Sequence, residues 1–214
     1  MTNQPLRYLS FVEALAFSAC VAWYIWQLQE SLRFSWIVFP IWLVGSFVLH
    51  KDTPQSLGWR ADNLRNSLKY SAAVFLPCFV TLVIVGLFLG AFHRSTFPLL
   101  VPRHFLSYMA FCLLQQVGLN SMVTNRLLAA TNSPIRAALL AGTLFALLHW
   151  PNPVLVPLTG IGGALMSWLF AKERNILSLT VWQAILGTAV WWAFPVAWHH
   201  AMRVGPGFYR FQLH

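Results

Sequence analysis

The feature that most constrains the fold is a long stretch, residues 71–92, that contains no charged side chain. A helix of about 20 mainly apolar residues is long enough to cross the hydrocarbon core of a bilayer. The whole chain has the same character, with 58% hydrophobic and 9% charged residues, against about 45–50% and about 25% in soluble domains. The sequence therefore predicts an integral membrane protein.

Apolar segments recur along the chain and predict an all-α bundle of seven transmembrane spans in one domain, residues 1–214. The spans lie near 9–27, 35–50, 70–92, 104–124, 136–150, 154–171 and 177–198. The second is short and contains Pro40, so we expect it to be tilted or incomplete. The first is too long for a removable signal peptide and contains Glu13. We therefore expect the chain to keep all of its spans.

The polar parts of the chain predict how it sits in the membrane. Residues 51–69 mix charges with Trp59, Leu64 and Leu68, a pattern typical of an amphipathic helix on the membrane surface. Of the 14 Lys and Arg residues, nine fall on the side of the N-terminus and five on the other, which predicts a cytoplasmic N-terminus. The net charge of +9 is spread over short loops, which favours membrane lipids over nucleic acid as partners.

Polar residues inside the predicted spans are candidates for a functional site. Gln115, Gln116 and Asn120 share the fourth span, and Gln183 lies in the last. His149 follows Phe145 by one helical turn at the end of the fifth span, just before Pro151 and Pro153. Such side chains are costly inside a membrane and by default mark a site, although amides also serve as hydrogen-bonding glue between helices.

The order and spacing of these residues resemble the CPBP family (CAAX protease and bacteriocin-processing, also called Abi) of intramembrane proteases. That family carries Glu-Glu-x-x-x-Arg, then Phe-x-x-x-His, then a histidine followed four residues later by Asn or Asp. In this chain the three corresponding segments are Gln115-Gln116-x-x-x-Asn120, Phe145-x-x-x-His149 and Gln183-x-x-x-Gly187. Leu-Gly-Trp-Arg at 57–60 and Arg-Asn at 174–175 add to the resemblance, which covers residues 55–200, with the motifs in 104–200.

The resemblance implies an endopeptidase of the bacterial inner membrane that cleaves prenylated or otherwise hydrophobic clients. In the family, the glutamate and the histidines activate a water, by a glutamic or a metal-dependent mechanism. Gln115 and Gln116 cannot accept a proton as a glutamate does, and of the charged or imidazole side chains only His149 is kept. The chain is therefore either a pseudoprotease or an enzyme with relocated chemistry. The alternative is a non-catalytic module that binds a lipid tail or a client helix in the same cavity, lined by Asn120, Phe145 and Gly187.

Four further residues are open candidates for relocated chemistry. Glu13 is the only acid inside a span and either reaches the headgroups or takes part in a site. Cys112 lies one turn before the glutamines. His199 and His200 point about 100° apart on a helix, so only one could join His149, and zinc would still lack ligands. The residues present require no cofactor, and no metal ligand is assigned.

Overall fold

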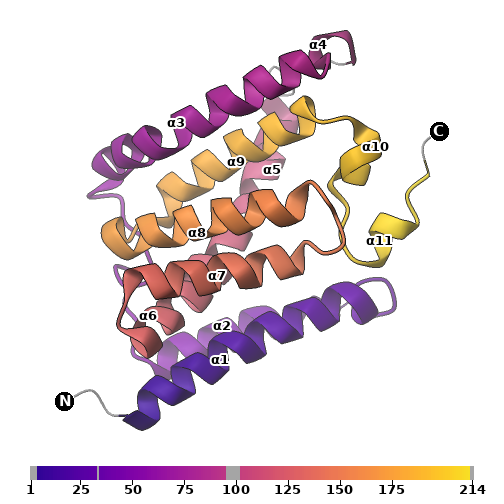
Figure 1. Ribbon diagram of the computed structural model, residues 1–214. Coiled ribbons are helices and arrows are strands. Elements are labelled where there is room, and N and C mark those ends of the chain that lie inside the picture. Colours follow the sequence, from indigo (N-terminus) through magenta and orange to yellow (C-terminus); the bar gives the residue numbers. More distant parts are fainter. Residues whose placement is uncertain (1–3, 33, 95–101, 213–214) are drawn as a thin grey trace.

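The computed structural model describes residues 4–32, 34–94 and 102–212, which form helices joined by turns, without a strand in these three segments (Figure 1). The first half comprises α1 (Gln4–Trp23) with its π-helical extension η1 (Tyr24–Leu28), the 3₁₀ turn η2 (Ser35–Ile37), α2 (Val38–Leu49), α3 (Leu64–Phe88) and α4 (Ala91–Arg94). The second half comprises α5 (Pro102–Gln116), the π-helix η4 (Val117–Thr124), α6 (Asn125–Thr131), α7 (Pro134–Leu148), α8 (Leu155–Glu173), α9 (Ile176–Ala193), α10 (Val196–His199), η5 (His200–Met202) and α11 (Pro206–Tyr209).

Four helices in the described segments are long and apolar enough to cross a membrane. They are Gln4–Leu28, Leu64–Phe88, Leu155–Glu173 and Ile176–Ala193, and two shorter apolar helices cover Ser35–Leu49 and Pro134–Leu148. The all-helical membrane fold is thus confirmed, whereas the predicted number of seven spans is not. The difference lies in α2 and α7, which have 12 and 15 residues, and in α5, whose end carries the amides.

The predicted amphipathic helix over 51–69 is wrong for its first part. Residues 51–63 form turns, and α3 begins only at Leu64. Gly58 adopts a positive φ of 85°, and its carbonyl accepts a hydrogen bond of 3.0 Å from the Ile176 N–H. A Cβ at position 58 would lie 2.7 Å from the Phe170 ring. The loop therefore packs tightly against the turn between α8 and α9, and only glycine fits there.

Small residues allow α7 and α8 to pack closely. A Cβ on Gly142 would come within 2.5 Å of the Gly160 carbonyl oxygen, and one on Gly163 within 3.0 Å of the Phe145 ring. Gly162, in contrast, has open space around it. The two helices therefore approach closely at Gly142 and Gly163, as is usual for helix pairs in membranes.

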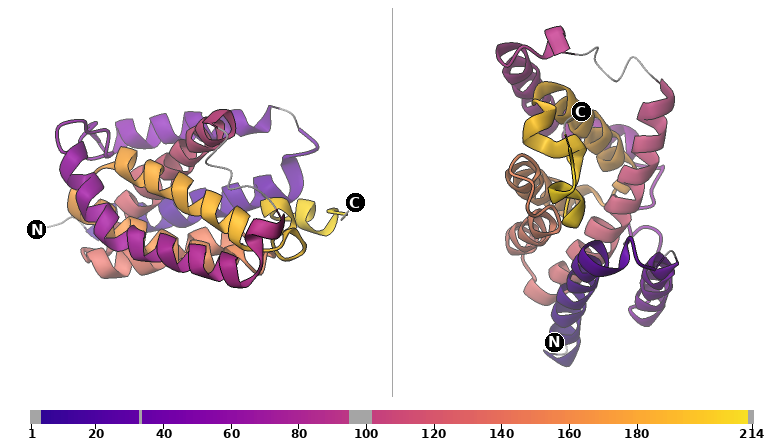
Figure 2. Two further views of the ribbon diagram at one scale, coloured as in Figure 1. Left: turned by 90° about the horizontal axis from the view of Figure 1, so that it is seen from above. Right: turned by 90° about the vertical axis from the view of Figure 1, so that its right-hand side faces the viewer.

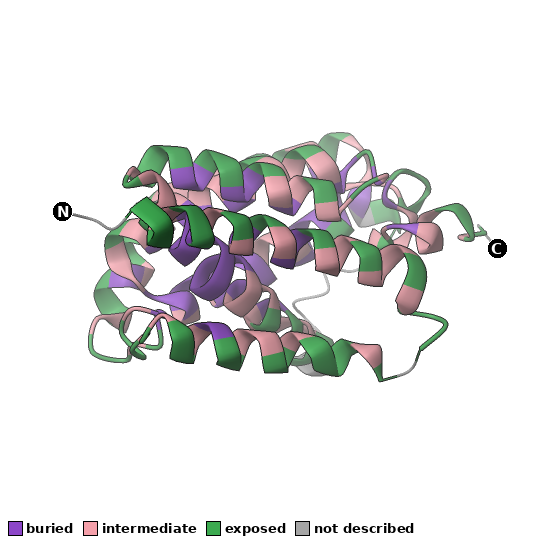
Figure 3. Cartoon of the chain, turned by 90° about the horizontal axis from the view of Figure 1, so that it is seen from below, coloured by how far each residue is buried: buried purple, intermediate pink, exposed green. Residues whose placement is uncertain are grey.

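The helical run α5–η4–α6 crosses the interior and carries the amide chain and the Arg126 network that are described below. The long helices lie side by side, with α1 and α2 on one flank and α3, beside α9, on the other (Figures 1 and 2). Residues 119–127 are all buried, and Figure 3 shows buried residues gathered on this inner run. A π-helix of eight residues turns the side chains that follow it relative to α5, a feature frequent at functional sites.

Candidate functional site

The amides of four predicted site residues form one hydrogen-bonded chain between α5–η4 and α9. Gln116 Nε2 donates to Gln183 Oε1 at 2.6 Å, and Asn120 Nδ2 donates to Gln116 Oε1 at 2.5 Å. Gln183 Nε2 in turn donates to Gln115 Oε1. Gln116 and Asn120 have no exposed surface, and Gln183 is 8% exposed. The first and third sequence motifs therefore meet inside the bundle.

The chemistry of this amide centre follows from its donors and acceptors. The N–H groups that bridge the helices donate to amide oxygens. Gln116 Nε2 also contacts the Met166 sulfur at 3.1 Å. An amide has no proton-accepting group that works near neutral pH. The centre can fix helix positions and hold a polar ligand, but it offers no general base.

His149 lies apart from this chain of amides. It caps the end of α7, where its Nδ1 lies 2.7 Å from the Phe145 carbonyl oxygen and its ring meets the Phe145 ring edge-on at 4.6 Å. Among the described residues, no hydrogen bond joins His149 to Gln115, Gln116 or Gln183. Phe145 packs on Gly163, one turn from the Met166 that Gln116 contacts. The last carbonyl groups of a helix lack hydrogen-bond partners within it. The His149 imidazole therefore pairs with a carbonyl of its own helix and not with a glutamine amide.

Gly187, the last of the predicted motif positions, lies against Tyr108 of α5. A Cβ at position 187 would overlap the Tyr108 hydroxyl and lie 2.9 Å from two carbons of its ring. The polar side chain that the resemblance places here is thus absent, and the phenol fills its space. The same hydroxyl lies next to the fully buried Cys112 thiol.

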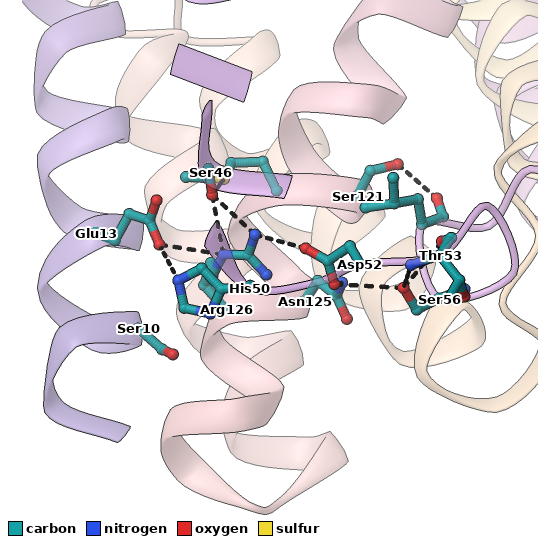
Figure 4. A network of polar contacts seen from close by, with 12 residues as sticks. Ser10, Glu13, Ser46, His50, Asp52, Thr53, Ser56, Ser121, Asn125 and Arg126 are labelled. Carbon is teal, nitrogen blue, oxygen red and sulfur yellow. Dashed lines mark hydrogen bonds and ion pairs between the residues drawn. The ribbon is translucent and has the colours of Figure 1, made fainter. Parts of the chain in front are cut away.

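A second buried network, which the sequence reasoning missed as a unit, surrounds Arg126 (Figure 4). The guanidinium, 2% exposed, donates to Glu13 at 3.1 Å, to Asp52 at 2.6 Å and to Ser46 Oγ at 2.8 Å. His50 Nε2 lies 2.8 Å from the same Glu13 oxygen. The signal for this network was present in the sequence, because a lone acid inside a span by default has a partner.

The Arg126 network extends to the turn between α8 and α9. Asn125 Nδ2 donates to Asp52 at 3.2 Å, and Arg174 donates to Asn125 Oδ1 and, at 3.1 Å, to the Ser56 carbonyl. Burial lowers the pKa of the Arg174 guanidinium, and the negative charge of Asp52 opposes that shift. Charge pairing therefore ties the loop after α2 to three other parts of the bundle.

The remaining candidates take structural positions. The idea that Glu13 reaches toward the headgroups is wrong, since its side chain is 11% exposed and paired with Arg126. His199 has no exposed surface and accepts the Met202 N–H at 3.2 Å, whereas His200 stacks on Phe208 at 3.9 Å.

A metal centre of the family kind does not fit the donors present. Zinc in proteins takes thiolate, imidazole or carboxylate ligands, and the amide centre supplies only neutral amides. Within the described segments, no group of three or more His, Cys, Asp or Glu side chains is placed to hold a metal ion.

The long apolar helices and the charges buried among them define a helical integral membrane protein. Its segment 106–189 matches the model of the family described as Type II CAAX prenyl endopeptidase Rce1-like. The resemblance to the CPBP family is thereby confirmed over this segment, which contains all three motifs. Comparison with curated proteins and with solved structures gives no significant match.

Proposed function

We propose that this protein is a pseudoprotease of the CAAX prenyl endopeptidase type, which binds a hydrophobic or prenylated client but does not cleave it. The observation that carries this proposal is the chain of amides from Gln115 to Gln183. It stands where the family motifs have carboxylate and imidazole, and three of its N–H groups donate to amide oxygens, while Asn120 Oδ1 has no partner among the described residues. General acid–base assistance contributes about 10²–10⁴-fold to a reaction, and this centre has no group that could supply it.

The Arg126 network does not replace the missing base in this proposal. Its two carboxylates, Glu13 and Asp52, are both engaged with a buried guanidinium. Each carboxylate accepts hydrogen bonds from this guanidinium and from a second side chain, His50 or Asn125, so neither lies open to a substrate water. The network serves as a structural anchor for the α2–α3 loop.

The proposed topology has seven passes and a cytoplasmic N-terminus in the plasma membrane of a bacterium. The beginning of α1 and the C-terminal helix α11 lie at opposite ends of the bundle (Figure 1), which supports an odd number of passes. The shorter helices α2 and α7 would cross with their ends near the headgroups, beside tilted neighbours. The basic loops at the end where α3 begins favour contact with anionic lipids.

A cleavage and capture assay tests the proposed function. The purified protein in lipid nanodiscs is incubated with a farnesylated peptide that carries a photoreactive group, and products are followed by mass spectrometry. We expect crosslinking without cleavage, and partial recovery of cleavage in the double variant Gln115→Glu, Gln183→His. Cleavage by the parent that is lost in His149→Ala would overturn the absence of catalysis, and lack of crosslinking would overturn client binding.

A further inference from the structure

The contact between Tyr108 and Gly187 lies one helical turn from the amide centre, on the same pair of helices. Gln183 and Gly187 are four residues apart on α9, and Tyr108 and Cys112 precede Gln116 at intervals of four on α5. Residues at this spacing share one face of a helix. The amide centre and the Tyr108 contact therefore form one continuous seam between α5 and α9.

Tyr108 and Gly187 have complementary shapes. A Cβ at 187 would meet the hydroxyl and the Cε1 and Cζ atoms of Tyr108, all three of its nearest neighbours belonging to this one side chain. The phenol thus occupies the volume that any side chain on α9 would need at this turn. Without the ring, the seam would contain an empty slot directly beside Gln183.

Tyr108 lies at the border between the buried face of α5, which carries Cys112 and Gln116, and its exposed face. Tyr108 is half-buried, and its neighbours on α5 are more exposed, with Leu106 at 56%, Phe111 at 52% and Leu114 at 70%. Phe111 also contacts the Tyr108 ring, with centroids 6.4 Å apart. Because exposed surface at membrane depth faces lipid tails, hydrocarbon is the material available to enter the slot.

We propose that Tyr108 is an internal plug for a hydrocarbon-binding slot between α5 and α9 that ends at the amide centre. When the ring swings away from Gly187, the slot admits a hydrocarbon chain, such as an isoprenoid, whose polar end reaches Gln183 and Gln116. This inference rests on the proposed function, since it assigns the place where an apolar client enters. An apolar cavity left by removal of a core side chain stays dry and takes up apolar molecules.

The first arm of the test is a double-mutant cycle measured as the melting temperature of the protein in detergent. Gly187→Ala should lower the melting temperature in the parent, because the new methyl group meets the phenol, and should have little effect in a Tyr108→Ala background. Gly162→Ala is the matched control, since a Cβ there meets nothing within 4 Å, and its effect should be small in both backgrounds. Equal effects of Gly187→Ala in both backgrounds would overturn the plug.

The second arm measures uptake of hydrocarbon, with a farnesol that carries a diazirine as the probe. Tyr108→Ala should increase labelling of α5 and α9 severalfold, and Tyr108→Leu, which keeps more of the packing, should increase it less. Coupling in the first arm without increased labelling would overturn the slot as a binding site. Cleavage of a prenylated peptide by the parent would overturn the pseudoprotease proposal and leave the plug standing, so the two failures are distinguishable.

Discussion

Arg126 shows how a single residue organises the interior of this protein. A buried guanidinium is costly unless its charge and its donors are matched. Here Glu13 and Asp52 supply two carboxylates and Ser46 supplies a hydroxyl oxygen. The residues come from α1, α2 and the loop after it, so Arg126 joins segments that lie more than 70 positions away in the sequence.

Replacement of Arg126 by Gln should strongly destabilise the fold. The change leaves Glu13 and Asp52 buried without their cation, and breaking a buried pair in this way costs about 3–5 kcal/mol. Unfolding by denaturant in mixed micelles measures the loss. Arg60→Ala is the control, because Arg60 pairs with the exposed Asp62, and it should give no measurable change. An Arg126→Gln variant as stable as the parent would show that the network contributes nothing.

His199 should make stability depend on pH. Burial lowers the pKa of its imidazole from an ordinary value of about 6.5. Below about pH 6.5 the unfolded chain binds a proton at this imidazole, whereas the folded chain does not. Stability is therefore highest above about pH 6.5 and falls as the pH decreases below it. Melting curves between about pH 8 and pH 5 should show this fall. It should be weaker in His199→Gln and unchanged in His104→Gln, which alters an exposed side chain; an identical fall in both variants would contradict the prediction.

At the scale of elements, Asn152 links the C-terminal segment to the turn between α7 and α8, beside a backbone hydrogen bond of 3.0 Å from the Gly205 N–H to the Trp150 carbonyl. Asn152, fully buried, accepts the N–H groups of Val154 and Leu155 at 3.1 and 3.0 Å, at the start of α8. Its amide nitrogen donates to the carbonyl oxygens of His199 and Arg203 at 2.8 and 2.9 Å. The same side chain therefore caps one helix and fixes the segment after α9.

Asn152→Ala should loosen this end of the bundle. The loss of a helix cap costs about 1 kcal/mol, and each buried carbonyl left unpaired adds about 1–3 kcal/mol. Hydrogen exchange should become faster in residues 196–209 and at the start of α8, and remain unchanged in α3. Asn132→Ala, at the end of α6, is a control that should leave residues 196–209 protected. Unchanged exchange in Asn152→Ala would mean that other contacts hold the segment.

At the scale of the whole molecule, the distribution of charge gives the bundle two unlike ends. Four basic residues lie near the loop after α2 and the end of α8, namely Arg60, Arg65, Lys69 and Lys172. The C-terminal helix α11 is preceded by Arg203 and followed by Arg210. The backbone contact between Gly58 and Ile176 confirms that the loop and the α8–α9 turn share one end. In the orientation that we propose from the positive-inside rule, this end faces the cytoplasm.

Cysteine labelling in intact cells should confirm that orientation. In a background without Cys20, Cys78 and Cys112, a cysteine in place of the exposed Gln55 should resist a membrane-impermeant maleimide until the cells are opened. A cysteine in place of Tyr209, which is 67% exposed, should react at once. Reaction of both positions in intact cells would contradict an odd number of passes.

The sequence by itself determined the class of fold and the residues of the amide centre. Runs of apolar residues report burial in lipid locally, and the amides that interrupt them must find partners nearby, so Gln115, Gln116, Asn120 and Gln183 were found without coordinates. The spacing of these residues also carried the resemblance that the family comparison confirmed over residues 106–189.

Only the tertiary structure decided which charged and aromatic side chains meet. The pairing joins residues far apart in the chain: Glu13, Asp52 and Arg126. It involves the segment just after the π-helix η4, and no local sequence pattern predicted that π-helix. Residues 51–63 were predicted to form a surface helix from the spacing of their apolar side chains. They form turns instead, because the loop packs against the turn between α8 and α9. Likewise, the partner of His149 is its own helix and the neighbour of Gly187 is Tyr108, because the relative positions of helices are set by long-range packing rather than by periodicity along the chain.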